Sequence, residues 1–143
     1  MRFWDASALV PLLVSQARSA PAAQALADDT ALVVAWTTEI ECASAVSRIA
    51  REPGLDSPAE RAAFARLADL SASWTEVQPT AVVRLTAIRL VRAHPLRAGD
   101  SIQLASAIAT ARDAPRELPF VTLDERLAEA AEREGFRVLI PDA

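Results

Sequence analysis

The chain has 143 residues, the usual length of one domain, so we expect residues 1–143 to fold as a single domain. Its formal net charge is −4 and all 15 basic residues are arginines, which excludes any chemistry that requires a lysine. The acidic balance argues against a protein that coats nucleic acid, but suits an enzyme that concentrates carboxylates in one site. Because the chain has one cysteine, no visible signal peptide and no apolar stretch that could span a membrane, we expect a cytoplasmic protein.

Apolar strand patterns alternate with helical patterns along the chain. The first half predicts a strand at 2–4, helices at 7–13 and 21–27, a strand at 31–36, and helices at 38–52 and 57–70. The second half predicts an edge strand at 74–77, helices at 80–92 and 101–109, a strand at 119–122, a helix at 124–134 and a strand at 137–140. This alternation predicts an α/β fold with a parallel sheet that helices cover on both faces.

Four acidic residues lie near the predicted carboxyl ends of strands or at the starts of helices. Asp5 and Asp124 follow strands, Asp100 precedes a helix of small residues, and Glu41 lies in the first turn of its helix. The pair Thr37-Thr38 can cap that helix, and Glu41 is three residues after Thr38, a capping-box spacing. In an open parallel sheet ligands collect at the carboxyl ends of the strands, and clustered carboxylates there favour a divalent cation such as Mg²⁺. By spacing alone, each acid is equally typical of a helix cap.

Local sequence adds a resemblance to a known family. The segments are FWDASALVPLL, TTEIECASAVSRIARE, LRAGDSIQLASAIATA and FVTLDERLAEAAEREGFRVL, which together span nearly the whole chain. In this order they resemble the sequence blocks of PIN domains, and the chain is similar in particular to the VapC-type toxins of bacterial toxin–antitoxin pairs. The resemblance implies a three-layer α/β/α sandwich around a parallel sheet of about five strands.

The resemblance also implies an activity and a site. The activity is that of an endoribonuclease that uses Mg²⁺ or Mn²⁺ to leave 5′-phosphate and 3′-hydroxyl ends on RNA, and the partners are a VapB-type antitoxin and a second copy of the chain. The acidic residues that match the family are Asp5, Glu41, Asp100 and Asp124, and the matching hydroxyl residues near the metal are Ser7 and Thr122. Glu39 competes for the second position, but in the family the acid is followed by a small-residue, arginine-containing helix, and Glu41 has that register. Glu39 is then expected to be a solvated acid of the first turn.

Two arginines are candidate contacts for RNA phosphates. Arg48 shares a helical face with Glu41, and Arg97 lies just before Asp100. For each of them a solvated or salt-bridged side chain is an equally good interpretation. His94 is the only histidine, which excludes a ribonuclease that uses paired histidines, and we expect it at the surface.

Two other functions place acids at the ends of parallel strands. A receiver-type phosphoacceptor domain does so, but it needs a lysine on its last strand and this chain has none. A PIN-like module that binds proteins without catalysis is the second alternative. The presence of all four acids argues against a decayed site, and a metal titration would separate this alternative from the nuclease.

Overall fold

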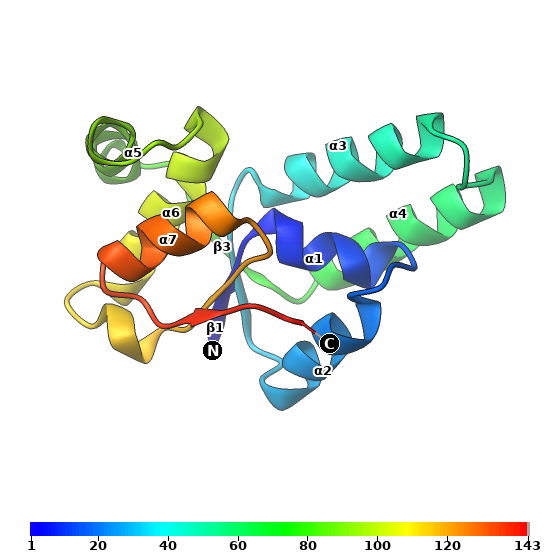
Figure 1. The fold of residues 1–143 in the computed structure, drawn as a ribbon, viewed down its shortest axis with the longest axis horizontal. Coiled ribbons are helices and arrows are strands. Elements are labelled where there is room, and N and C mark those ends of the chain that lie inside the picture. Colours follow the sequence, from blue (N-terminus) through cyan, green and yellow to red (C-terminus); the bar gives the residue numbers. More distant parts are fainter. Residues whose placement is uncertain (143) are drawn as a thin grey trace.

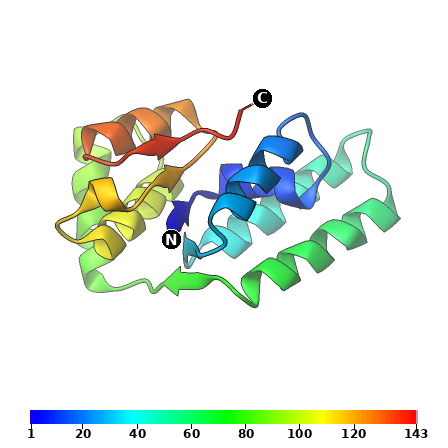
Figure 2. The same ribbon diagram turned by 90° about the horizontal axis from the view of Figure 1, so that it is seen from below.

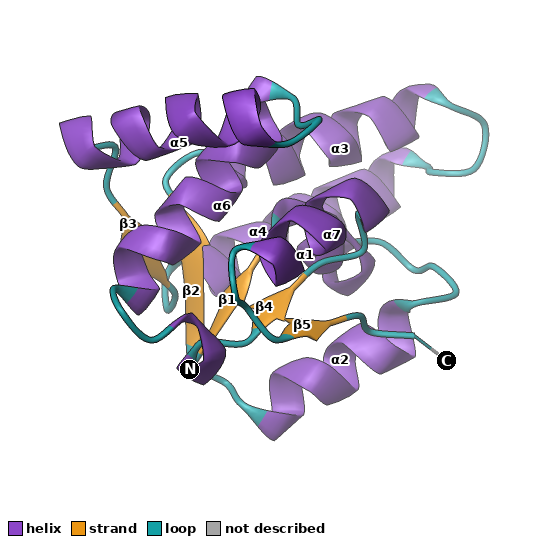
Figure 3. Cartoon of the chain, turned by 60° about the vertical axis from the view of Figure 1, so that its left-hand side comes forward, coloured by secondary structure: helices purple, strands orange, loops and turns teal. Residues whose placement is uncertain are grey.

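A computed structural model describes residues 1–142, so Ala143 lies outside the described part (Figure 1). Its centre is one sheet with the strand order β3-β2-β1-β4-β5, in which every neighbouring pair is parallel. Figure 3 shows the strands side by side. They are β1 (Arg2–Trp4), β2 (Leu32–Ala35), β3 (Thr75–Val77), β4 (Phe120–Val121) and β5 (Val138–Leu139). The predicted five-stranded parallel sheet is confirmed, with the third strand at an edge.

Helices cover both faces of this sheet, which confirms the three-layer α/β/α arrangement (Figures 1 and 2). One face carries α1 (Ala6–Leu13), α2 (Ser19–Asp28), α3 (Thr38–Arg51) and α4 (Ser57–Ser71). The other carries α5 (Ala81–Ala93), α6 (Ala98–Ala111), the short 3-10 helix η1 (Pro115–Glu117) and α7 (Glu125–Arg133). Within residues 1–142, no helix combines the length and apolar character needed to cross a membrane.

The alternation of side chains along the strands divides the core into two clusters. Phe3 and Phe120 belong to the cluster under α5, α6 and α7, whereas Trp4 and Val121 belong to the cluster under α1, α3 and α4. Phe3 and Phe120 are paired in register and stack with ring centroids 5.3 Å apart. Because successive residues point to opposite faces, two-residue segments are enough to anchor both helical layers.

The strand order creates a switch point between β1 and β4. The chain starts in the middle of the sheet, adds β2 and β3 on one side, and then adds β4 and β5 on the other. After β1 it turns into α1 on one face, and after β4 it turns into α7 on the opposite face. In open α/β sheets this divergence leaves a crevice beyond the carboxyl ends of the strands, where ligands bind.

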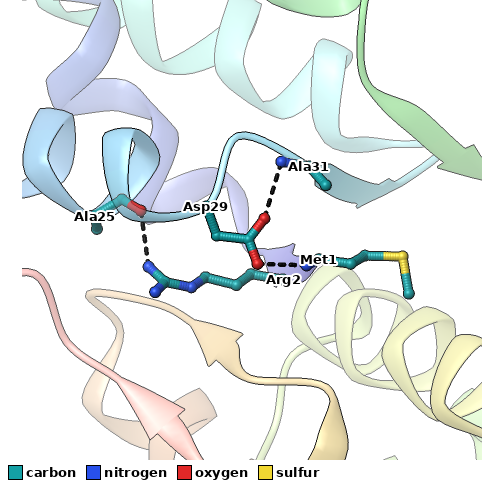
Figure 4. Close-up of polar contacts among 5 residues, drawn as sticks. All are labelled: Met1, Arg2, Ala25, Asp29 and Ala31. Atoms are coloured by element: carbon teal, nitrogen blue, oxygen red, sulfur yellow. Dashed lines mark hydrogen bonds and ion pairs between the residues drawn. The ribbon is translucent and has the colours of Figure 1, made fainter.

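The amino end of β1 is held by polar contacts at the end of the sheet opposite to the switch point (Figure 4). The carboxylate of Asp29 accepts hydrogen bonds from the amino group of Met1 and from the backbone N–H of Ala31, the latter at 3.1 Å. The guanidinium of Arg2 donates to the backbone oxygen of Ala25 at 2.7 Å. These contacts join β1 to the α2–β2 connection, so Asp29 serves the register of the sheet at the end opposite to the switch point.

Two local predictions are wrong. Thr38 does not cap α3: the cap residue is Thr37, whose side chain makes no capping bond, whereas the Thr38 hydroxyl is buried and pairs with Gln103 of α6. His94 is not at the surface, because its side chain is only 7% exposed and its Nε2 lies 3.1 Å from the carboxylate of Glu134. In both cases a contact between helices distant in sequence overrides the local pattern.

Candidate active site

Asp5 is the first residue after β1 and the N-cap of α1. Its Oδ2 accepts three hydrogen bonds: from the Ser7 backbone N–H at 3.2 Å, from the Ser7 hydroxyl, and from the Thr122 hydroxyl at 3.0 Å. No described residue donates a hydrogen bond to Oδ1, and Asp5 is only 3% exposed. Burial raises the pKa of Asp5 to about 6; the Glu41 charge adds to the rise, and the hydrogen bonds from Ser7 and Thr122 oppose it.

The hydroxyls of Ser7 and Thr122 connect the segments that follow the neighbouring strands β1 and β4. They lie 3.2 Å apart, and each also accepts a backbone N–H from the β4–α7 connection: Leu123 donates to Ser7 at 2.9 Å and Asp124 donates to Thr122 at 3.0 Å. This network holds the Asp5 carboxylate in one orientation, because every group around Oδ2 is itself held by the backbone.

Asp124 is the N-cap of α7 and accepts the Leu127 backbone N–H at 2.9 Å through Oδ1. Capping α7 is therefore one role of Asp124. A capping carboxylate has a second oxygen, and no described residue donates a hydrogen bond to Oδ2 of Asp124. The helix cap thus orients the side chain and leaves Oδ2 available to a ligand.

Glu41 projects from the first turn of α3 towards α6. Gln103, which is fully buried, donates a hydrogen bond from Nε2 to Glu41 Oε1 at 3.1 Å and is itself paired with Thr38. Burial raises the pKa of Glu41, and the nearby Asp100 charge adds to the rise while the Gln103 bond opposes it. Glu39, the competing acid, is exposed.

Asp100 lies inside the first turn of α6 rather than before it, because the helix begins at Ala98 and not at Ser101. This places Asp100 three residues before Gln103, on the same helical face. A Cβ built on Gly99 would lie 3.8 Å from Glu41 Oε1, which shows how closely the start of α6 approaches α3. Burial raises the pKa of Asp100, and the Asp124 charge raises it further.

Repulsion links the four acids in a row. Asp5 interacts with Glu41, Glu41 with Asp100, and Asp100 with Asp124. Within residues 1–142, however, no three carboxylate, imidazole or thiol groups already form an arrangement that could hold a metal ion. The donor set consists of carboxylate and hydroxyl oxygens, which suits Mg²⁺ or Mn²⁺ rather than zinc or copper.

A cleft of about 620 Å³ opens beside Asp100 and Asp124. Arg97 lines it, as the sequence suggested for a phosphate contact, whereas Arg48 is exposed on α3 and is not among the lining residues. Arg126 lines it too, and sequence reasoning missed this residue. Its position in the sequence could have indicated this role, because Arg126 lies two residues after Asp124, in the first turn of a helix at the switch point.

The fold and the acidic strand ends together define an α/β/α protein with an oxygen-rich site at the switch point of its sheet. The family model described as "PIN domain" matches residues 2–133. The chain therefore belongs to the PIN domain family, whose members are nucleases.

Solved structures of similar fold cover nearly the whole chain. A toxin–antitoxin complex from Klebsiella pneumoniae is 16% identical over 99% of this chain and 98% of its own, with a TM-score of 0.67. PAE2754 from Pyrobaculum aerophilum is 22% identical over 96% of this chain and 87% of its own, with a TM-score of 0.65. FitAcB from Neisseria gonorrhoeae is 16% identical, with coverages of 99% and 98% and a TM-score of 0.67. No curated protein sequence matches the chain. At these identities the likeness shows the fold.

Proposed function

We propose that this chain is a metal-dependent endoribonuclease of the VapC type, the toxin of a type II toxin–antitoxin pair. The observation that carries the proposal is the row of four acids at the switch point of a PIN domain, in which each acid repels the next. Mg²⁺ or Mn²⁺, when bound there, supplies an activated water and neutralises charge on the phosphodiester. The residues proposed to hold it are Asp5, Glu41, Asp100 and Asp124.

The side chains have different parts in this proposal. Asp5 is the preorganised ligand, because Ser7 and Thr122 hold Oδ2 and leave Oδ1 for the cation. Within residues 1–142 no three of these side chains are arranged in advance as ligands, so the cation is proposed to bind through fewer carboxylates, with water completing its coordination. Mg²⁺ in proteins commonly uses one or two carboxylates together with water and substrate oxygens, so a sparse site of this kind is compatible with binding.

The toxin assignment is supported by a likeness to a solved structure and not by the geometry of the site. One solved structure of the same fold is described as a toxin–antitoxin complex, and its likeness extends over 99% of this chain. We propose a small VapB-type antitoxin as the partner and a homodimer as the working form. Expression of the wild type should arrest bacterial growth, expression of Asp100→Asn should not, and co-expression of the antitoxin should relieve the arrest. Growth arrest by Asp100→Asn would overturn the link between toxicity and the site.

The catalytic proposal is tested by comparing the wild type with Asp100→Asn and with the control Glu39→Gln. Glu39 is exposed on α3, so its replacement changes the net charge by the same amount outside the site. In Mg²⁺ or Mn²⁺ the wild type and the control should cut RNA, whereas Asp100→Asn should be at least about a hundredfold slower. The substrates must include structured and unstructured RNAs, because recognition can be selective. Equal cleavage in EDTA, or a full rate for Asp100→Asn, would refute the mechanism.

Calorimetry of cation binding separates this proposal from a PIN-like module that only binds proteins. A catalytic site should bind Mn²⁺ in the wild type and in Glu39→Gln, and more weakly in Asp100→Asn. A protein that binds no cation at millimolar concentration and cuts no RNA, yet forms a stable complex with a partner, would favour the non-catalytic module.

A further inference from the structure

The cleft beside Asp100 and Asp124 contains two arginines from different helices. Arg97 is the residue before α6, and Arg126 lies in the first turn of α7. Both side chains are exposed. Both guanidinium groups act on the Asp100 carboxyl, whose pKa they lower against the larger effects of burial and Asp124. Two cations are therefore close to the proposed reaction site without belonging to the acidic row.

Neither guanidinium makes an ion pair within residues 1–142. Other arginines do: Arg89 pairs with Glu134, and Arg133 pairs with Glu129. An unpaired guanidinium keeps its planar set of N–H donors available, and this geometry matches two oxygens of a phosphate. Arg97 and Arg126 are thus available to an anion, and the cleft volume of about 620 Å³ is within the range of small-ligand sites.

The charge balance of the cleft decides when an anion can enter. Its lining includes three carboxylates, from Asp100, Asp124 and Glu125, against the two guanidinium groups. With no cation the carboxylates dominate and repel a polyanion. One divalent cation at the carboxylates reverses the local sign, and the arginines then attract a phosphate. Anion binding in this cleft should therefore depend on the divalent cation.

We propose that Arg97 and Arg126 form a clamp for one backbone phosphate of the RNA strand, next to the phosphate that is cut. The inference rests on the proposed function for the identity of the strand. A clamp of this kind positions the substrate without reading its sequence, because phosphate contacts carry no base information. It also gives a role to Arg126.

The test measures binding of a fluorescent single-stranded RNA 12-mer by anisotropy in Ca²⁺, with a gel to verify that the strand stays intact. The variants are Arg97→Gln and Arg126→Gln. The control is Arg61→Gln, an exposed arginine of α4 on the other face of the sheet. Each clamp variant should weaken binding about tenfold, and the dependence of log affinity on log salt should become shallower by about 0.7 for each lost contact. The control should leave both quantities unchanged.

Cation binding provides a second readout that a purely structural role would not reproduce. Removing either guanidinium takes a positive charge away from Asp100, so affinity for Mn²⁺ should be kept or should rise while affinity for RNA falls. A DNA 12-mer should lose affinity in parallel, because the contact is with the phosphate. Loss of both cation and RNA binding would show that the arginines only support the fold, and would overturn the clamp.

The outcomes for the clamp and for the proposed function are distinguishable. If the wild type binds and cuts RNA but both clamp variants bind as tightly as the wild type with the same salt dependence, the clamp is wrong and the nuclease stands. If the wild type binds the 12-mer through these arginines but cuts no RNA in Mg²⁺ or Mn²⁺, the clamp stands and the nuclease proposal falls.

Discussion

Replacing Asp5 with asparagine measures the electrostatic cost of the site. Burial raises the pKa of Asp5 in the folded protein to about 6, from the ordinary value of 3.8. Because the folded state holds this proton more tightly, the contribution of Asp5 to stability is fully present below about pH 4 and is lost as the pH rises through about 6. With about 1.4 kcal/mol for each pKa unit, ionised Asp5 lowers the free energy of unfolding by about 3 kcal/mol at pH 8.

Asparagine removes this cost while keeping the local structure. All three hydrogen bonds to Asp5 converge on Oδ2, and the amide oxygen of asparagine can accept them. We expect Asp5→Asn to be more stable than the wild type by about 1–3 kcal/mol at pH 8 in EDTA, since a neutral acceptor makes somewhat weaker bonds than a carboxylate. At pH 4 the difference should be close to zero. The assay is urea denaturation across this pH range, with the exposed Asp69→Asn of α4 as a control.

Added Mg²⁺ should narrow the difference in stability, and should reverse it only in large excess over its dissociation constant. A cation that binds only the folded wild type raises its free energy of unfolding in proportion to the logarithm of the free cation concentration, and Asp5→Asn should show little of this gain. A stability gain of the same size at pH 4 and pH 8 would refute the electrostatic reasoning. A variant that is less stable than the wild type at pH 8 would show that the hydrogen bonds from Ser7 and Thr122 need the full charge of the carboxylate.

Two further predictions concern the support of Glu41 and the oligomeric state. Gln103→Leu should lower the free energy of unfolding by about 1–3 kcal/mol, because the buried Thr38 hydroxyl and the Glu41 carboxylate lose a hydrogen-bond donor; an unchanged urea midpoint would contradict this. The homodimer stays a prediction, and α5 offers a face for it, since Leu85 and Ile88 are 66% and 50% exposed. Leu85→Arg should reduce the mass in light scattering to the monomer value of 15.3 kDa, and a wild type that already scatters as a monomer would remove the claim.

The parts of the fold that the sequence predicted are those with a local cause. Apolar runs bounded by turns predicted the bounds of every strand to within one residue. Asp5 directly follows β1, and Asp124 lies three residues after β4. The start of α6 was placed three residues too late, because Gly99 reads as a helix breaker. The helix nevertheless begins at Ala98, where the Ser101 backbone N–H donates to the Arg97 oxygen at 3.0 Å.

The features that the sequence could not predict depend on pairs of distant residues. Gln103 supports Glu41 from 62 positions away, and the buried His94 meets Glu134 from 40 positions away. No local spacing signals either contact, since both arise from the packing of one helix against another. Arg126 is different, because its place in the first turn of a helix could be predicted from the sequence. Only the structure shows that it lines the same cleft as Arg97.

An acidic protein that acts on a polyanion needs a place where its local charge is reversed. The formal net charge here is −4, and the cleft holds more carboxylates than guanidinium groups, so RNA and a divalent cation should bind with positive coupling. By thermodynamic linkage, a cation that raises the affinity for RNA must have its own affinity raised by RNA by the same factor. Such coupling fits the absence of a ready-made three-ligand site within residues 1–142, because substrate oxygens can complete the coordination of Mg²⁺. We therefore expect cation affinity to be weak in the free protein and to increase when an RNA backbone phosphate occupies the clamp.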